Sequence, residues 1–336
     1  MKVFMIGTQR SGSNLLRLMV NQAPSIAAPH PPHILERFTP LLAAYGNLAE
    51  EANFTRLVDD VVRLVEVNPV SWGVDFDRAR IRARCRDNSL VAVFGSIMDH
   101  MAESYGKPDW MCKSLANVHF LPEIERYFGA DARYLYLYRD GRDVCLSFLK
   151  AVVGEKTAYH VARQWDLEQQ LALECGRRVP AAQYLALSYE ELTSNPESTL
   201  SLLCRWLGIE FSPAMLDFHA SEEASKTAAS GKMWENVRKP VMATNTKKWL
   251  GGMTKDQVVD FESVAGRSLT ELGYDLEFVS RTEAPRRYDT ATQAALDAEN
   301  KQRKAAVKEE LPPEDIAARK PQDDLLASIR SRLVNA

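Results

Sequence analysis

The 336-residue chain lacks the features that mark membrane proteins. It has no uninterrupted apolar run near the roughly 20 residues that a membrane-spanning helix needs. The apolar stretch at residues 3–6 is also too short for the core of a signal peptide. We therefore expect a protein with no membrane span that is located in the cytoplasm.

The chain is also poor in cysteine and nearly neutral in charge. Its five cysteines are odd in number, well separated and without a Cys-x-x-Cys pair, which argues against a disulfide framework and a zinc site. A net charge of -3, from 42 basic and 45 acidic residues, argues against a protein that binds nucleic acid by neutralising phosphates. With 46% hydrophobic residues, the chain can bury a substantial core.

Hydrophobic patterning predicts an α/β fold. Strands are predicted at residues 2–6, 109–113, 133–138 and 183–187, and helical segments separate them. Strands that alternate with helices favour a three-layer architecture with a central, mostly parallel sheet. We assign residues 1–280 to this α/β domain.

Two regions depart from the alternating pattern. Residues 34–105 show only helical periodicity, so we expect a helical insertion that forms a lid or an acceptor pocket. Residues 281–336 carry 11 basic and 10 acidic residues with a single aromatic, Tyr288, and cannot build a core of their own. They predict a charged helical tail, either solvated or docked on a partner subunit as part of a homo-oligomer.

A glycine-containing turn, Gly-Thr-Gln-Arg-Ser-Gly, joins the first predicted strand to the first predicted helix. Such a turn aims backbone N–H groups and the positive end of a helix dipole at one point, which makes it a P-loop-like anion site. Gly7 and Gly12 have Walker-motif spacing, but Ser13 replaces the lysine and Asn14 the magnesium-binding hydroxyl. A kinase is therefore disfavoured. Arg10 is either the clamp for a transferred anionic group or a surface arginine on a structural turn.

A second candidate anion site follows the predicted strand at residues 133–138. Arg139 comes directly after this strand, where ligands bind in open α/β sheets. Ser147 lies eight residues on, about two helical turns along, so both side chains could grip one phosphate. Alternatively, Arg139 belongs to a charged cluster that caps the next helix, and Ser147 is incidental.

The two segments together resemble the phosphosulfate loop and the 3'-phosphate motif of sulfotransferases that use 3'-phosphoadenosine 5'-phosphosulfate (PAPS). The segments are Gly-Thr-Gln-Arg-Ser-Gly-Ser-Asn-Leu-Leu and Tyr-Arg-Asp-Gly-Arg-Asp-Val-Cys-Leu-Ser. Leu-Ser-Tyr-Glu-Glu-Leu at residues 187–192 and Thr-Lys-Lys-Trp at 246–249 resemble later blocks of that family. The resemblance covers about residues 1–278.

The resemblance implies a role for each matching residue. The loop would hold the 5'-phosphosulfate of PAPS through Arg10, Ser11, Gly12, Ser13 and Asn14. Arg10 would also stabilise charge on the bridging oxygen as the sulfuryl group leaves. The 3'-phosphate and adenine side would be held by Arg139, Ser147, Tyr189 and Lys248, with Lys247 as a near substitute. Tyr189 has an alternative place in the core, and the two lysines could be a solvated pair. No metal is expected.

The general base is the least defined part of this prediction. The histidine that follows a Lys-Thr or Lys-Ser pair in many members is absent, since Leu115 stands there. His30 and His33 flank the position of a glutamate that other members carry, and imidazole titrates in the useful range. We take these two histidines as catalytic candidates, with Glu36 behind them. They could instead cap the next helix from a rigid proline-rich connector. Lys113 could contact the transferred group or simply carry a charge at a strand end.

The sequence therefore predicts a PAPS-dependent sulfotransferase that transfers a sulfuryl group to a hydroxyl or amine by in-line displacement. Its acceptor would be a small molecule, a carbohydrate or a lipid, without nucleic acid. Two alternatives stay open. One is a P-loop phosphotransferase, and the other is a non-catalytic nucleotide-binding protein that keeps the 3'-phosphate grip but lacks a base.

Overall fold

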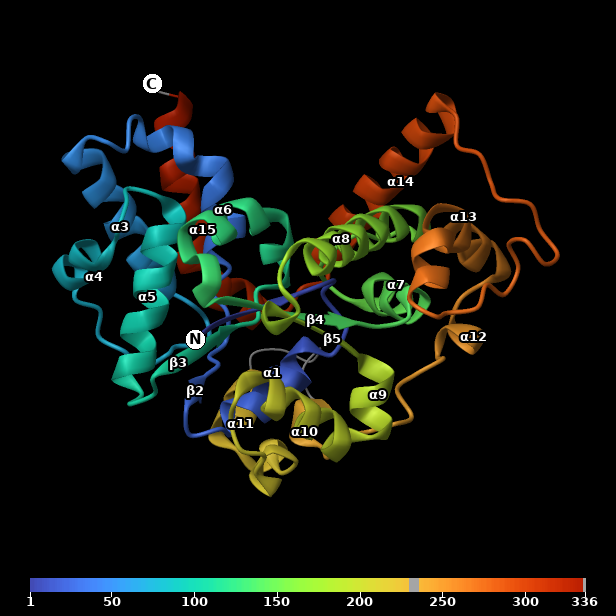
Figure 1. Ribbon diagram of the computed structural model, residues 1–336. Helices are drawn as coiled ribbons and strands as arrows, with labels where there is room; N and C mark the ends of the chain where they lie inside the picture. Colours follow the sequence, from blue (N-terminus) through green and yellow to red (C-terminus); the bar gives the residue numbers. More distant parts are fainter. Residues whose placement is uncertain (230–235, 335–336) are drawn as a thin grey trace.

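The computed structural model describes residues 1–229 and 236–334 and has a parallel five-stranded sheet at its centre (Figure 1). Its order is β2-β3-β1-β4-β5, and every recorded pair of neighbours is parallel. The strands are β1 (Lys2–Ile6), β2 (Ile26–Ala27), β3 (Asp109–Cys112), β4 (Ala132–Tyr138) and β5 (Tyr184–Ser188). The predicted α/β fold is confirmed. Only β2 was missed, because a two-residue strand leaves no periodicity to detect.

Both faces of the sheet are buried, as expected for parallel strands. On β1, Phe4 and Ile6 belong to one hydrophobic core cluster, and Val3 and Met5 belong to another. β4 lies beside β1 in a register that pairs Val3 with Arg133. Because side chains alternate along a strand, this continuous apolar run supplies both layers of the core.

Helices cover the two faces as separate layers (Figure 1). One face carries α1 (Ser13–Asn21), α9 (Tyr189–Ser194), α10 (Pro196–Leu207) and α11 (Glu222–Ala229). The other carries α2 (Ile34–Phe38), η1 (Thr39–Tyr45), α3 (Glu51–Glu66), α4 (Arg78–Arg84), α5 (Leu90–Ser104), α6 (Leu121–Phe128) and α8 (Ala158–Arg178). A third core cluster joins α8 to α7 (Gly141–Lys150) and α13 (Lys255–Glu271), and α12 (Trp249–Gly252) packs beside α7. The three-layer architecture is therefore confirmed.

The region predicted as a helical insertion consists of α2, η1, α3, α4 and α5. The side chains of Asp77 and Ser89 cap α4 and α5 by accepting backbone N–H groups. Beneath α5, Phe4, Phe94 and Trp110 pack ring against ring, with centroids 5.3 to 5.8 Å apart. The insertion is thus fixed on the sheet. Among the helices of the described residues, none combines the length and apolar character needed to cross a membrane.

The charged C-terminal segment is helical and packs on its own chain. It forms α14 (Thr290–Glu309) and α15 (Pro313–Val334). Leu326 and Ile329 of α15 are 7% and 0% exposed and lie in the same core cluster as α2 and α3. The alternative of a solvated tail therefore does not describe α15, and docking on a partner subunit stays a prediction. Its few apolar residues form a narrow stripe that the charge-rich composition concealed.

The docking of α15 can be tested at its buried isoleucine. Ile329→Ala should lower the free energy of unfolding by about 2–4 kcal/mol, because it leaves a cavity in the shared core. Leu333→Ala removes a side chain that is 37% exposed and should cost under about 1 kcal/mol. Urea unfolding measures both. Equal, small effects would show that α15 does not belong to the core.

Candidate functional site

The carboxyl ends of all five strands lie at one edge of the sheet and lead into one cavity of about 1050 Å³. Each strand is followed by a side chain that lines this cavity. In sheet order from β2 to β5 these side chains are His30, Lys113, Arg10, Arg139 and Tyr189. This arrangement is expected of an open α/β sheet, which binds ligands at the carboxyl ends of its strands. The sequence placed four of these five positions after predicted strands.

The glycine-containing loop after β1 keeps its shape through close contacts. Gly7 and Gly12 have φ angles of 129° and 89°, which side chains rarely adopt. A Cβ atom at Gly12 would lie 2.3 Å from the Tyr189 ring, and one at Gly7 would lie 2.4 Å from the Leu137 carbonyl oxygen. Arg10 also has a positive φ, of 74°. Such backbone strain at a non-glycine residue is concentrated at functional sites.

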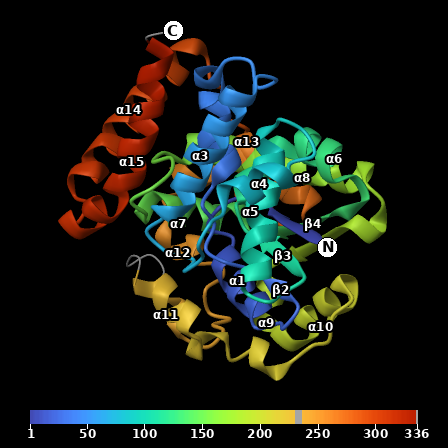
Figure 2. The same cartoon turned by 90° about the vertical axis from the view of Figure 1, so that its left-hand side faces the viewer.

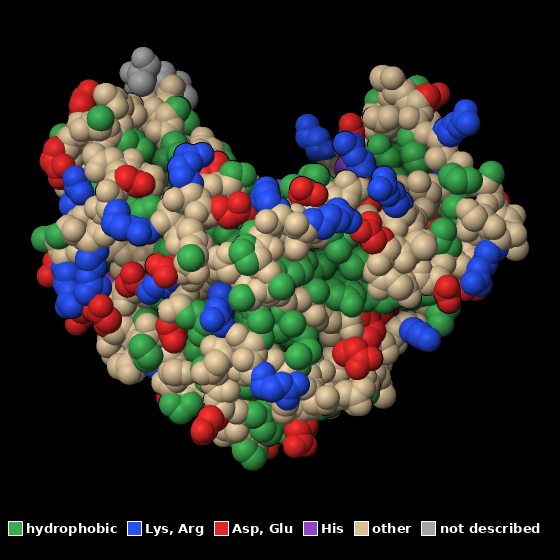
Figure 3. Space-filling view, in the orientation of Figure 1, with side chains coloured by type: hydrophobic (Ala, Val, Ile, Leu, Met, Phe, Trp, Pro, Cys, Tyr) green, Lys and Arg blue, Asp and Glu red, His purple; other side chains and the backbone are tan. Residues whose placement is uncertain are grey.

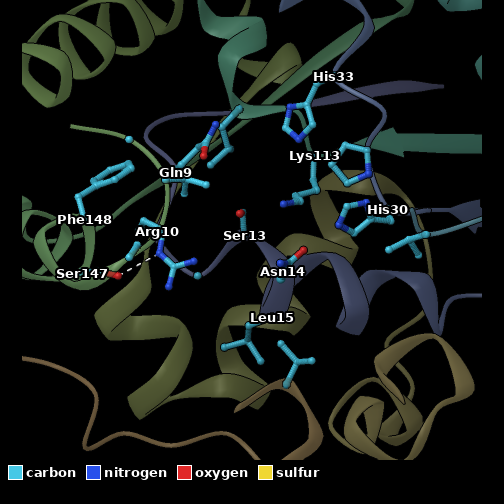
Figure 4. A pocket seen from close by; sticks show the side chains of 18 of the residues that line it. Gln9, Arg10, Ser13, Asn14, Leu15, His30, His33, Lys113, Ser147 and Phe148 are labelled. Carbon is cyan, nitrogen blue, oxygen red and sulfur yellow. Dashed lines mark hydrogen bonds between the residues drawn. The ribbon is translucent and has the colours of Figure 1, made fainter. Parts of the chain in front are cut away.

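The two sequence motifs meet directly in the structure. The Arg10 Nε donates a hydrogen bond to the Ser147 Oγ at 2.9 Å (Figure 4). The Arg139 Nη1 donates to the Arg10 carbonyl oxygen at 3.0 Å. Residues that stand more than 120 positions apart in the chain therefore form one cationic cluster. Burial, followed by the charge of Arg139, lowers the pKa of Arg10.

Arg139 is held from several sides. Its guanidinium lies 4.4 Å from the centre of the Tyr189 ring, and its Nη2 donates to the Asn245 carbonyl oxygen at 2.5 Å. The Asn245 side chain donates to the Tyr189 hydroxyl at 3.0 Å. Asp143 lies 3.8 Å from the guanidinium. Sequence reasoning missed Asn245, although it directly precedes the Thr-Lys-Lys-Trp segment.

The cavity takes in most, but not all, of the predicted binding residues. Gly12, Ser13, Asn14 and Lys248 line it, together with the residues already described. Lys247 does not line it, and its backbone N–H donates to Asp143. Ser11 is fully buried beneath the loop and is not a lining residue. Consecutive residues of a turn cannot all face the same side. Lys248 therefore lines the cavity, whereas Lys247 does not.

Three buried polar atoms around the loop have no hydrogen-bond partner in the described part of the chain. They are Ser11 Oγ, Asn14 Oδ1 and Arg139 Nε. Buried polar atoms are normally paired, so the unpaired atoms of Asn14 and Arg139, two residues that line the cavity, indicate a place for a polar ligand. Within residues 1–229 and 236–334, no group of His, Cys, Asp and Glu side chains could hold a metal ion.

The histidines lie on the β2 and β3 side of the cavity. Figure 4 shows His30 and His33 beside Lys113, with Ser13 and Asn14 between this group and Arg10. His33 has a φ of 56°, and its Nδ1 lies 3.2 Å from a carboxylate oxygen of Glu36. His33 occupies the N-cap position of α2, but its side chain makes no capping hydrogen bond. The alternative that it serves as a helix cap is therefore not supported.

The backbone around His30 is fixed on both sides. The Trp72 Nε1 donates to the His30 carbonyl oxygen at 2.7 Å. The Arg17 Nη1, fully buried, donates to the Ala28 carbonyl oxygen at 2.8 Å. Burial is the main cause that lowers the pKa of both histidines, and nearby positive charges add to it. For His33 the Glu36 carboxylate opposes this shift.

The cavity is strongly basic although the whole chain is weakly acidic. Nine basic residues line it against three acidic ones, Glu36, Asp143 and Asp315. The basic residues are Arg10, Arg37, Lys113, Arg139, Lys150, Lys239, Lys248, Arg319 and Arg330. Figure 3 shows basic and acidic side chains intermixed over the face of the molecule drawn in Figure 1. The predicted absence of a global basic surface is thus compatible with a local anion site.

Comparison with known proteins assigns the chain to a family. The sequence model described as "Sulfotransferase family" matches residues 2–213. The chain belongs to the sulfotransferase family. Its activity is therefore the transfer of a sulfuryl group, as the sequence predicted. The kinase alternative does not stand.

Protein-tyrosine sulfotransferases are among its relatives. Protein-tyrosine sulfotransferase A of Caenorhabditis elegans is 23% identical over 286 residues, which cover 81% of this chain and 67% of the relative. Protein-tyrosine sulfotransferase 2 of Gallus gallus is 22% identical over 285 residues and is covered to 69%. These relatives contradict the predicted cytoplasmic location. That prediction rested on the lack of a long apolar run, which does not determine a compartment.

Solved structures agree with the fold. The sulfotransferase domain from the Synechococcus PCC 7002 olefin synthase has a TM-score of 0.57 and 22% identity, over 82% of this chain and 95% of that domain. The sulfotransferase domain from the curacin biosynthetic pathway gives the same TM-score and identity, over 98% of its length. At this identity the likeness concerns the fold.

Lys113 makes the stability of this sulfotransferase depend on pH. Burial, then the charges of Arg17 and Arg10, lowers the pKa of Lys113 from 10.5 to about 7. Between these values the unfolded chain binds the proton that the folded chain has lost, so stability should rise with pH across this window. Lys113→Met should remove that part of the rise. Urea unfolding at pH 7, 8.5 and 10 measures it, and identical slopes in both proteins would contradict the shift.

Proposed function

We propose that this sulfotransferase uses PAPS as its donor and transfers the sulfuryl group to a hydroxyl of its acceptor. The observation that carries the proposal is the convergence of the two motifs at one cavity, through the Arg10–Ser147 and Arg139–Arg10 hydrogen bonds. The unpaired Asn14 and Arg139 atoms and the excess of basic residues in the cavity lining support an anionic ligand. These residues fit a nucleotide with phosphates at both ends of its ribose.

The order of the strands supports an orientation for the donor. Arg139 and Tyr189 follow β4 and β5, so we assign the 3'-phosphate and the adenine to that side. The loop with Arg10, which follows the central strand β1, would hold the 5'-phosphosulfate. Ser13, Asn14 and Lys248 would contribute further contacts, whereas Ser11 and Lys247 face away from the cavity. The acceptor then enters from the side of β2 and β3.

Bound PAPS supplies an activated sulfuryl group, and the chain supplies position and charge. Sulfuryl transfer, like phosphoryl transfer, runs in line between two oxygens, so fixed cations and backbone N–H groups provide most of the catalysis. Arg10 would stabilise the negative charge on the leaving oxygen. Lys113 would hold a proton near the acceptor side once an anion offsets the positive charges around it.

We assign the base to His33 rather than to His30. A useful general base has a pKa near the working pH, and a carboxylate partner raises the basicity of an imidazole. Glu36 provides that partner at 3.2 Å from His33. Burial, followed by the charges of Lys113 and Arg17, lowers the pKa of His30 well below its ordinary value. Glu36 would orient the imidazole and not remove the proton itself.

The names of the relatives support a tyrosyl hydroxyl of a polypeptide as the acceptor. A phenolic hydroxyl suits a histidine base, because its pKa of about 10 makes the proton easier to remove than that of an aliphatic alcohol. A small-molecule, carbohydrate or lipid acceptor, as first predicted from the sequence, is the alternative. A panel of phenols, sugars and tyrosine peptides with radiolabelled PAPS separates the two classes.

Donor recognition can be tested by calorimetry with 3',5'-bisphosphoadenosine and 5'-AMP. Arg139→Ala should weaken bisphosphoadenosine binding by about 100-fold, and Ser147→Ala by about tenfold, since charged hydrogen bonds are worth about 1.5–3 kcal/mol. AMP binding should change little in Ser147→Ala. Arg267→Ala, an exposed residue of α13, is the control. Equal losses for both nucleotides in Ser147→Ala would contradict the 3'-phosphate assignment.

The base can be tested separately from donor binding. His33→Gln should lower kcat by about 100-fold or more while the affinity for bisphosphoadenosine stays within twofold. The acid limb of the wild-type rate should lie below pH 6.5, because the pKa of His33 is lowered from 6.5 and the base must be neutral. His119→Gln, outside the cavity lining, is the matched control. A larger loss in His30→Gln would transfer the role to His30.

A further inference from the structure

The outer wall of the cavity, away from the donor motifs, is formed by one face of α15. Six of its residues line the cavity: Asp315, Ala318, Arg319, Gln322, Leu326 and Arg330. Apart from the adjacent pair Ala318 and Arg319, successive members are three or four residues apart, which places them along one side of the helix. This helix lies beyond residues 2–213, which match the family. The wall is therefore a feature of this chain that the family assignment does not cover.

The position of this wall is fixed by buried contacts. The Gln322 side chain is 2% exposed and donates to the Leu64 carbonyl oxygen at 3.1 Å, beside Asn68. Arg332 pairs with Asp60 of α3 at 2.6 Å. Together with the buried Leu326 and Ile329, these contacts attach residues 322–332 of α15 to the helical insertion. A rigid wall can discriminate between acceptors, because it does not change its shape to fit each of them.

The wall also lies next to the proposed base. Arg37 of α2 donates a hydrogen bond to Gln322 of α15. Arg37 stands four residues after His33, so the two share one side of the helical turn that begins α2. Burial is the main cause that lowers the pKa of Arg37; on α15, the charge of Asp323 opposes the shift and that of Arg319 adds to it, so both lie near this point. The lining face of α15 is therefore connected directly to α2, the helix that His33 precedes.

The preceding helix braces the opposite rim. Asn300 of α14 accepts a hydrogen bond from the Lys156 backbone N–H at 2.7 Å, and Lys304 pairs with Glu155 at 3.0 Å. These contacts hold the connection between α7 and α8, whose Val153 and Gly154 line the cavity. Figure 1 shows α14 and α15 diverging from their connection toward the two lobes, and Figure 2 shows both along one side of the molecule.

We propose that α15 is the acceptor-binding wall of this enzyme, and that Ala318 and Arg319 are specificity-determining residues that contact the part of a polypeptide acceptor flanking its reactive hydroxyl. This inference rests on the proposed function, since it takes the β2 side of the cavity as the acceptor side. It assigns to Ala318 and Arg319 no contact with the donor. Changes on the lining face of α15 should therefore alter the use of the acceptor and leave donor binding intact.

The chain offers adjacent pairs for a matched test. Ala317 and Ala318 are both exposed, but of the two only Ala318 lines the cavity. In Ala318→Trp, kcat/KM for a nonapeptide with a central tyrosine should fall by about tenfold or more, because one pocket contact is worth about 10- to 200-fold. In Ala317→Trp it should stay within twofold. The smaller acceptor N-acetyltyrosine amide should be less affected by Ala318→Trp than the peptide is.

A second pair tests the charged part of the wall. Arg319→Gln should raise KM for the nonapeptide about fivefold with kcat within twofold, whereas Lys320→Gln, which removes only a surface ion pair with Asp324, should change neither. Calorimetry with bisphosphoadenosine should give wild-type affinity in all four variants.

Equal effects within each pair, or a loss of bisphosphoadenosine affinity that parallels the loss of turnover, would overturn the proposal for α15. If neither tyrosine probe is turned over, peptide binding to the bisphosphoadenosine complex is compared in the same variants, and equal or absent binding overturns it. Failure of the donor assignment is recognised independently, because wild-type protein would then not prefer bisphosphoadenosine to AMP.

Discussion

The parallel pairing of β1 with β3 on one side and β4 on the other determines the geometry of the site. Because these strands run in one direction, the segments that follow them emerge at the same edge of the sheet. Lys2 pairs with both Trp110 and Ala132, so the three strands are in step. A slip of one residue would exchange the two faces of a strand and turn its final side chain away from the cavity.

The same pairing brings several positive charges together at the buried carboxyl ends of the strands, where water screens them poorly. Arg10, Lys113 and Arg139 converge from three strands, and burial and mutual repulsion lower the pKa of the first two. The fold therefore carries an electrostatic cost that an anionic substrate would relieve. The net charge of the protein gives no indication of this, because acidic residues elsewhere on its surface offset the cluster.

The sequence predicted those parts of the site that are formed by residues close together in the chain. The loop after β1 and the Arg139–Ser147 pair are each encoded within about ten residues, and both were found. Contacts between residues far apart in the sequence were not found in this way. Asn245 was missed: it is held at the site by contacts with Arg139 and Tyr189, and Asp143 accepts the backbone N–H groups of the nearby Lys247 and Trp249. Lys248 was preferred to Lys247 only through the family resemblance. The stripe on α15 was concealed by its charged residues.

Arg139 illustrates how such a site tolerates divergence. Two of its hydrogen bonds go to main-chain oxygens, those of Arg10 and Asn245, and these oxygens persist whatever side chains the two positions carry. The orientation of the guanidinium is thus inherited from the path of the backbone. Side chains at the neighbouring positions can therefore change without altering the orientation of Arg139. The backbone geometry of the site can be retained after most of its residues have been substituted.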